Sequence, residues 1–190
     1  MEQLKNEKLT VTISAHGAEL QSIKNAEGRE YLWQGDEKYW PRRSPLLFPI
    51  VCGLWKDEYR VDGRTFNLPR HGFARDMDFE VVEKSDTSVT YTLESSPETR
   101  EVYPYDFELD VTYILNDDAI SVIWSVKNTG KQEMHFQIGG HPAFNLPGVA
   151  EGDKMHGSIL FDNVEPLTRI IGNTGGCIKP ERYELKTDRQ

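Results

Sequence analysis

Two histidines stand in the stretches of this sequence whose residue types are suited to chemistry. His141 lies within Gly139–Asn145, between a glycine pair and Pro142, directly after an alternating apolar run. Glycine lets the backbone approach a ligand closely, and proline biases the residue before it toward an extended conformation. His71 lies in a second stretch, Pro69–Arg75, with a glycine directly after it. Both patterns predict a titratable ring at a strand end, on backbone with little freedom.

Paired imidazoles without a cofactor motif favour proton transfer, because imidazole titrates near neutral pH. The sequence has no phosphate-binding loop, dinucleotide fingerprint or Gly-x-Ser-x-Gly elbow, so we expect no cofactor. Two distant histidines leave zinc binding as an alternative, but no third ligand stands near either, and we expect no metal. A core-packed or solvated ring is the other alternative for each histidine, and it is the state we expect for His16, His135 and His156.

Three arginines near these stretches are candidate ligands for the substrate. Arg42 and Arg43 open a proline-interrupted apolar segment, and Arg75 ends the stretch that contains His71. Arginine forms charge-assisted, often bidentate bonds with oxyanions, and it also donates to neutral hydroxyl groups. The sequence therefore leaves open whether the substrate carries a phosphate.

The composition is that of a folded acidic domain. The 190 residues are 37% hydrophobic and 11% aromatic, enough for a sizeable core in a single domain. A net charge of −9 disfavours nucleic acid and anionic membranes as partners, since both reward clusters of Lys and Arg. No apolar run is long enough to span a bilayer, and the first residues lack a secretory signal core. Cys52 and Cys177 form no disulfide framework or metal-ligand spacing, so we expect free thiols in a reducing cytoplasm.

Strands and tight turns must position the two histidines. Apolar residues alternate over Leu9–Ile13, and two long runs, 107–115 and 120–126, alternate on either side of a turn. Such alternation predicts antiparallel strands with one buried face, and it places Trp124 in the core. The predicted fold class is therefore all-β: a large antiparallel β-sandwich with very little helix.

Local signals add a hairpin, a short helix and an irregular segment. Asp62–Gly63 is suited to a type I′ hairpin turn, and Ser96–Pro97 is suited to the start of a helix. In the apolar segment 41–53, Pro45 and Pro49 exclude a central strand. That segment is expected to be buried, irregular chain at a sheet edge or at the floor of a pocket.

The C-terminal part of the sequence is different. The alternation weakens after Pro147, and residues 178–190 are polar, with no final strand predicted. A sandwich that finishes in this way leaves a strand edge open, so association with another chain is plausible and the oligomeric state stays undetermined.

Three stretches, taken together and in order, resemble the aldose 1-epimerase (galactose mutarotase-like) family, and within it the LacX-like branch. They are Trp40–Gly53, His71–Arg75 and Gly139–Asn145. Each motif is weak alone, but the combination is specific, and the resemblance covers essentially the whole chain. It implies the large β-sandwich and an enzyme that interconverts the α and β anomers of a free hexose or, in one branch, of a hexose 6-phosphate.

The resemblance also implies roles for single residues. His141 would be the general acid that protonates the ring oxygen, and His71 would hydrogen-bond the sugar and steady developing charge. A glutamate would take the proton from the C1 hydroxyl, so that the ring opens, the C1–C2 bond rotates and the ring closes from the other face. The predicted substrate-binding residues are Arg42, Arg43, Arg75 and Asn145.

The sequence departs from the family pattern at that glutamate. In the family it lies in a C-terminal strand region beyond residue 190, and Glu165, Glu181 and Glu184 do not match its motif. We therefore expect residues 1–190 to form a single domain that lacks its C-terminal strands and is a poor mutarotase. A carbohydrate-binding module without catalysis and a purely structural β-sandwich are the alternative functions.

Overall fold

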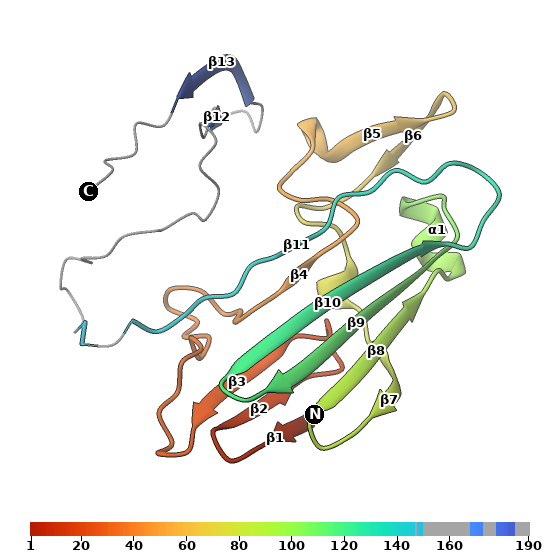
Figure 1. Ribbon diagram of the computed structural model, residues 1–190. Coiled ribbons are helices and arrows are strands. Elements are labelled where there is room, and N and C mark those ends of the chain that lie inside the picture. Colours follow the sequence, from red (N-terminus) through yellow and green to blue (C-terminus); the bar gives the residue numbers. More distant parts are fainter. Residues whose placement is uncertain (147, 150–167, 173–177, 185–190) are drawn as a thin grey trace.

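The computed structural model describes residues 1–146, 148–149, 168–172 and 178–184. Strands dominate these ranges, and the first three form one antiparallel sheet (Figure 1). In this sheet the central strand β2 carries Val11, which pairs with Leu4 on one side and Ile23 on the other. All three side chains are buried, so this sheet has one core face. Its strands are β1 (Glu2–Lys5), β2 (Leu9–Ile13) and β3 (Leu20–Asn25).

A second antiparallel sheet has the strand order β10-β9-β8-β7. Its longest pairing joins β9 and β10 over ten residues each, around the turn that the sequence predicts. Side chains along β9 are buried at every second position, which confirms the predicted core face of that strand. The strands are β7 (Glu80–Lys84), β8 (Ser88–Glu94), β9 (Phe107–Asn116) and β10 (Ala119–Asn128).

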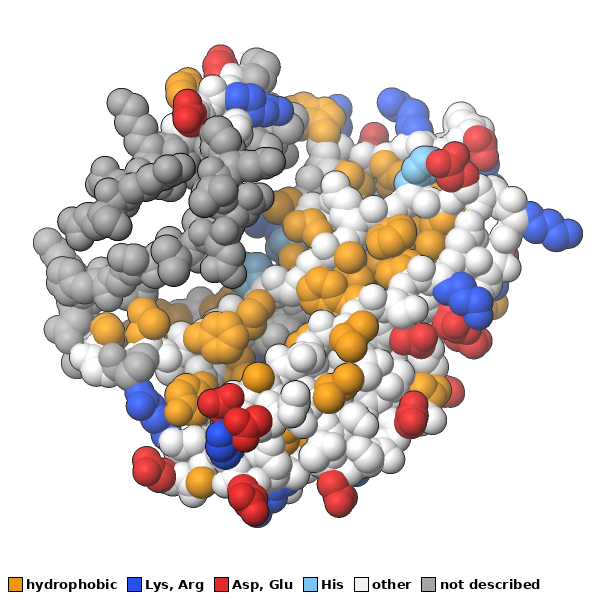
Figure 2. All heavy atoms as spheres, in the orientation of Figure 1, with side chains coloured by type: hydrophobic (Ala, Val, Ile, Leu, Met, Phe, Trp, Pro, Cys, Tyr) orange, Lys and Arg blue, Asp and Glu red, His pale blue; other side chains and the backbone are white. Residues whose placement is uncertain are grey.

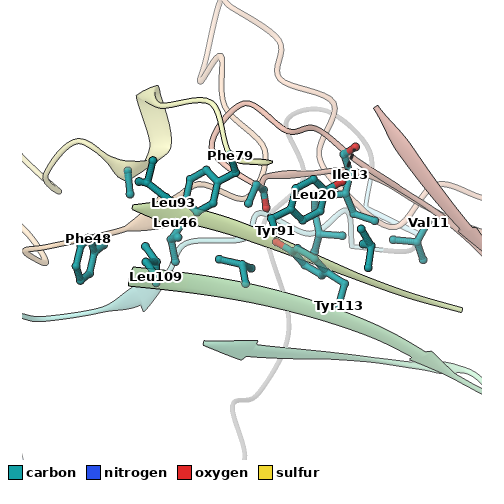
Figure 3. Packing of buried hydrophobic residues seen from close by; sticks show 14 of the residues in the cluster. Val11, Ile13, Leu20, Leu46, Phe48, Phe79, Tyr91, Leu93, Leu109 and Tyr113 are labelled. Carbon is teal, nitrogen blue, oxygen red and sulfur yellow. Dashed lines mark hydrogen bonds between the residues drawn. The ribbon is translucent and has the colours of Figure 1, made fainter. Parts of the chain in front are cut away.

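The two sheets pack against each other through their apolar faces. Figure 3 shows Val11, Ile13 and Leu20 of the first sheet among the side chains of Tyr91 and Tyr113 of the second. The two phenols also bond across the layers: the Tyr113 hydroxyl donates to the Ala18 carbonyl at 2.6 Å and the Tyr91 hydroxyl to the Ile13 carbonyl at 3.4 Å. A buried phenol needs such a partner, so these bonds fix how the sheets lie on one another.

A hairpin and a short helix form where the turn signals predict them. The strands β5 (Glu58–Val61) and β6 (Arg64–Asn67) pair around Asp62–Gly63, and both turn residues have positive φ, 48° and 77°. A type I′ turn requires this conformation. The helix α1 (Pro97–Val102) is capped by the Ser96 hydroxyl, which accepts from the Thr99 N–H at 3.3 Å. Both predictions are confirmed.

The segment 41–53 is mostly irregular, as its prolines predict, and its residues 45–49 are buried. It contains the two-residue strand β4 (Leu46–Leu47), which pairs with β11 (Gly139–Gly140). Two 3₁₀ turns follow it along the chain, η1 (Trp55–Asp57) and η2 (Ala74–Asp76). These short elements position the candidate site.

The C-terminal prediction was wrong in one respect. A strand does form there: β13 (Ile178–Glu184) pairs with β12 (Thr168–Gly172) in an antiparallel hairpin. Residues 181–184 of this strand are exposed, so they show no alternation of buried apolar side chains. The sequence-based statements on His156, Glu165 and Cys177 lie outside the described residues.

The prediction that Trp124 belongs to the core was also wrong. Ile120 and Val126 of the same strand are partly buried against the core, but Trp124 is 37% exposed. The physical reason is a hollow between β3 and β10, which leaves the indole without full cover. In the part of the chain that the structure describes, no helix has the length and apolar composition to cross a membrane.

Candidate active site

The strand pair β4 and β11 carries His141 into position. Gly140 pairs with Leu46, and the next N–H, that of His141, donates to the Pro45 carbonyl at 3.1 Å. A Cβ atom at Gly140 would lie 3.2 Å from the indole of Trp124. The glycine therefore lets the chain pass close to this ring, and His141 follows directly on a fixed strand end.

The stretch around His71 reaches the same irregular segment by a different route. Gly72 forms a parallel bridge with Phe48, and a Cβ atom at Gly72 would lie 2.2 Å from the Phe48 carbonyl oxygen. Gly72 has φ of +71°, in the left-handed region that favours glycine. His71 itself has φ of +70°, an uncommon conformation for a residue with a side chain. The contact with the Phe48 backbone therefore requires glycine at position 72, and it helps to set the direction of the His71 ring.

The two imidazoles, far apart in the sequence, lie next to each other in the structure. The ring centroids of His71 and His141 are 6.2 Å apart, with the planes at 54°. The indole of Trp40 lies beside His141, and the centroids of these two rings are 5.1 Å apart. His141 is exposed and His71 is half-buried, so the pair faces solvent. A small molecule can reach both rings.

A backbone hydrogen bond fixes the tautomer of His71. The Cys52 N–H donates to His71 Nδ1 at 3.0 Å, and the His71 N–H donates back to the Cys52 carbonyl at 2.8 Å. Because Nδ1 accepts, the proton of the neutral ring sits on Nε2. His71 therefore presents Nε2–H as a hydrogen-bond donor.

Surroundings also hold His71 in its neutral form. Burial lowers the pKa of His71 below its ordinary value, and the positive charge of Arg75 adds to this effect. Smaller contributions in the same direction come from His141, Arg70 and Arg42. The two histidines thus differ in character: His71 is set up as a neutral donor, whereas His141 carries no such backbone bond on its ring among the contacts of the described residues.

One carboxylate gathers two of the predicted arginines. Asp76 Oδ1 accepts from Arg42 Nη2 at 2.7 Å, and Asp76 Oδ2 lies 3.5 Å from Arg75 Nε. Arg75 also donates from Nη2 to the Arg70 carbonyl at 2.7 Å. The guanidinium groups of Arg42 and Arg75 are thereby held beside His71, which feels the charge of both.

The other two predicted binding residues are engaged elsewhere. The Arg43 guanidinium donates from Nη1 to Gln21 Oε1 at 2.8 Å, and its backbone N–H donates to Glu19. The Asn145 side-chain nitrogen donates to the Leu32 carbonyl at 2.9 Å. Both side chains thus tie the site loops to the first sheet and the chain after it. The assignment of Arg43 and Asn145 as substrate ligands stays a prediction. For Asn145 the group left to bind a substrate is the amide oxygen, because the amide nitrogen donates to Leu32.

Sequence reasoning did not single out three features of the site. Arg70 lies inside the His71 stretch and Asp76 directly follows it, so their proximity to the histidine was the available signal. The backbone of Cys52 gave no signal, because its bond to His71 joins chain segments that only folding brings together. In the described part of the chain, no three His, Cys, Asp or Glu side chains are grouped so that they could hold a metal ion.

Comparison with known proteins shows the family of this chain. A family model described as aldose 1-epimerase matches residues 2–160. The chain is 42% identical over 171 residues to the chromosomal LacX protein of Lactococcus lactis subsp. lactis, and the match covers 86% of this chain. The chain belongs to the aldose 1-epimerase family. The same match covers 56% of the LacX protein, so this chain spans little more than half the length of that relative.

Solved structures of this family share the fold. A galactose mutarotase related enzyme from Lactobacillus acidophilus superposes with a TM-score of 0.84 at 38% identity, covering 96% of this chain and 61% of its own. A galactose mutarotase-like protein from Lactobacillus casei ATCC 334 gives 0.82 at 36% identity, covering 97% and 67%. The predicted all-β sandwich of the galactose mutarotase type is thereby confirmed.

Proposed function

We propose that this chain carries the sugar-binding and general-acid part of an aldose 1-epimerase site, which interconverts the α and β anomers of a hexose without a cofactor. The observation that carries the proposal is the approach of the His71 and His141 rings to 6.2 Å, on an exposed face beside Trp40. Proton transfer at the ring oxygen needs an acid and a donor that hold the pyranose between them. We assign the donor role to His71, whose Nδ1 accepts from the Cys52 N–H, and the acid role to His141.

In this proposal His71 binds and His141 reacts. The Nε2–H of neutral His71 donates to a sugar oxygen. Protonated His141 gives its proton to the ring oxygen while a base takes the proton of the C1 hydroxyl. The bond between C1 and the ring oxygen breaks, its electron pair stays on that oxygen, and C1 becomes an aldehyde. Rotation about C1–C2 and the reverse proton transfers give the other anomer.

Neighbouring groups complete the binding surface. The Trp40 indole offers an apolar face for the sugar C–H groups, and Arg42 and Arg75 offer N–H donors. Asp76 is engaged by both arginines, so it does not serve as the base in this proposal. The base is the glutamate that the family resemblance implies.

The test compares anomer interconversion by NMR in the wild type and two variants of the whole chain. His141→Gln should remove about 10²–10⁴-fold of any acceleration above buffer, because the acid is lost. His135→Gln is the matched control, since His135 is exposed and lies apart from the pair, and it should change nothing. Equal rates for the wild type and His141→Gln, both well above buffer, would contradict the proposal.

A second candidate function is sugar binding without catalysis. The engagement of Asp76 by two guanidinium groups favours it, because this carboxylate follows the His71 stretch directly and both its oxygens already face arginines. Saturation-transfer NMR separates the two functions. Hexose binding that needs His71 and His141, together with anomer exchange at the rate of buffer, would identify a binding module.

The substrate can be a neutral or a phosphorylated hexose. The arginines near His71 favour testing the phosphorylated hexose. Arg75, Arg70 and Arg42 each lower the pKa of His71, so three cations lie near this ring. A phosphate binds more strongly than a hydroxyl at such a cluster. Glucose 6-phosphate should then bind more tightly than glucose or galactose at low salt. Equal affinities for the phosphorylated and the neutral sugars would mean that the arginines bind sugar hydroxyl groups.

A further inference from the structure

A separate pocket of about 460 Å³ lies between the β5–β6 hairpin and the chain that follows β10. Three tyrosines line it, Tyr59 of the hairpin and Tyr103 and Tyr105 of the segment before β9, and we call it the tyrosine pocket. Asp62 of the hairpin turn and Glu133 of the chain after β10 also line it. Figure 2 shows acidic side chains at the edge of the molecule where these two segments meet. None of the side chains proposed to bind or transform the hexose lines this pocket.

Tyr105 has a buried ring and a hydroxyl group without a hydrogen-bond partner among the described residues. The residue is 5% exposed, and its ring packs against that of Tyr103 with the centroids 4.8 Å apart. The other two hydroxyls of the pocket are paired: Tyr103 donates to the His135 carbonyl at 2.9 Å and Tyr59 to the Val102 carbonyl at 2.7 Å. Buried phenols normally have a partner, so an unpaired hydroxyl in a pocket wall indicates a ligand.

The Tyr105 hydroxyl lies near two carboxylates. Burial raises the pKa of Tyr105, and the negative charges of Asp62 and Glu133 raise it further. In the described part of the chain neither Asp62 nor Glu133 forms an ion pair. Two uncompensated negative charges near one hydroxyl favour a cation and repel an anion.

The wall of the pocket has more free hydrogen-bond acceptors than donors. The hydroxyls of Tyr59 and Tyr103 donate to carbonyls and keep lone pairs that can accept. Gln132 donates from its amide nitrogen to the Pro104 carbonyl at 2.6 Å and keeps its amide oxygen. Arg60 also lines the pocket, but strand alternation places its side chain on the face of β5 opposite to Tyr59. Such a wall suits a ligand group that only donates, and a primary ammonium group has three donors and no acceptor.

The remaining lining of the pocket is apolar. Ile50, Leu54 and Leu68 contribute to it, and Leu68 is fully buried. A bare metal ion would leave this apolar part empty, and a neutral sugar has acceptor lone pairs that need donors. The volume lies within the range of small-molecule sites. The pocket therefore fits a hydrocarbon body that carries a cationic donor.

We propose that the tyrosine pocket binds a small organic primary amine in its protonated form. The ammonium group lies between Asp62 and Glu133 and donates to the Tyr105 hydroxyl oxygen, while the hydrocarbon body packs on Leu54 and Leu68. An aliphatic amine is protonated near neutral pH, so it brings the full positive charge that the two carboxylates lack. This site is separate from the imidazole pair and does not depend on the proposed hexose chemistry.

The first test compares two probes on the whole chain, cyclohexylamine and cyclohexanol, which has the same ring without the charge. NMR chemical-shift titration gives both dissociation constants. At low salt cyclohexylamine should bind more than about tenfold more tightly, because the alcohol cannot form charge-assisted bonds with the carboxylates. Equal dissociation constants, or tighter binding of glucose than of cyclohexylamine at the Tyr105 resonances, would overturn the proposal.

The second test removes single charges. Glu133→Gln and Asp62→Asn should each raise the dissociation constant of cyclohexylamine about fivefold and leave that of cyclohexanol unchanged. Asparagine tolerates the φ of 48° at position 62, so this variant keeps the turn. Glu58→Gln is the matched control, since it removes the same charge from an exposed position of the same hairpin outside the pocket, and it should have no effect. Equal weakening in Glu58→Gln would show a general charge effect and overturn the proposal.

Tyr105→Phe removes the unpaired hydroxyl and should weaken the binding of cyclohexylamine about fivefold. Circular dichroism checks the fold of this variant, because the ring is buried. Unchanged binding in folded Tyr105→Phe would contradict the role of the hydroxyl. If the variant does not fold, the two carboxylate variants at exposed positions decide the question. None of these readouts depends on mutarotase activity.

Discussion

The histidine site and the hollow share the strand pair β4 and β11, but they are built in opposite ways. The site rests on backbone contacts between irregular segments: Gly72 against Phe48, and Cys52 against His71. The hollow is bounded by regular strands whose apolar side chains lack a packing partner. The difference teaches that contacts within the described chain set the imidazole pair, whereas regular strand pairing alone leaves the apolar face of β10 exposed.

The largest expected effect comes from breaking the backbone contact at the site. Gly72→Ala places a Cβ atom 2.2 Å from the Phe48 carbonyl oxygen at φ of +71°, so we expect a loss of more than about 4 kcal/mol in the free energy of unfolding. Gly28→Ala is the control, since Gly28 has φ of +83° with open space around it and should lose only about 1–2 kcal/mol. Urea unfolding followed by circular dichroism measures both. Similar losses of stability in the two variants would show that the clash with the Phe48 carbonyl adds nothing to the cost of the positive φ.

A matched pair of valines measures the other side of the comparison. Val111 on β9 is 1% exposed, so Val111→Ala should lose about 2 kcal/mol of stability from lost burial and the cavity left behind. Val122 on β10 is 39% exposed, and Val122→Ala should lose less than about 1 kcal/mol. Equal losses would mean that the side chain of Val122 is as well packed as that of Val111.

The same contrast explains which parts of the fold the sequence predicts. The runs 107–115 and 120–126 alternate in the same way, yet only the first has an apolar face that is buried along its whole length. Alternation reports which side chains share a face of a strand, and it carries no information on whether another layer covers that face. The position of Trp124 was wrong for this reason. The strand β13 was missed for the converse reason, because its exposed residues 181–184 leave no apolar pattern to read.

The candidate site was predictable where it depends on local backbone chemistry. Glycines beside His71 and His141 indicated that the backbone approaches a ligand closely. The structure shows both glycines in close contact with the chain itself, Gly72 with the Phe48 backbone and Gly140 with the Trp124 indole. The Cys52 bond to His71 and the pairing of Asp76 with Arg42 join segments distant in sequence. No spacing rule predicts such contacts from one sequence.

The smallest expected effect concerns the charge around His71. Burial and then the Arg75 charge lower the pKa of His71, so Arg75→Gln should raise this pKa toward its ordinary value while Arg75→Lys should leave it low. The shift is measured from the imidazole proton resonances of the whole chain between pH 4 and 8. The unfolded chain protonates this ring at higher pH than the folded chain does, so stability falls as pH drops below about 6.5. Arg75→Gln should make that fall shallower. An unchanged His71 titration in Arg75→Gln would show that burial alone holds the ring neutral, and that the arginines act on the substrate and not on the imidazole.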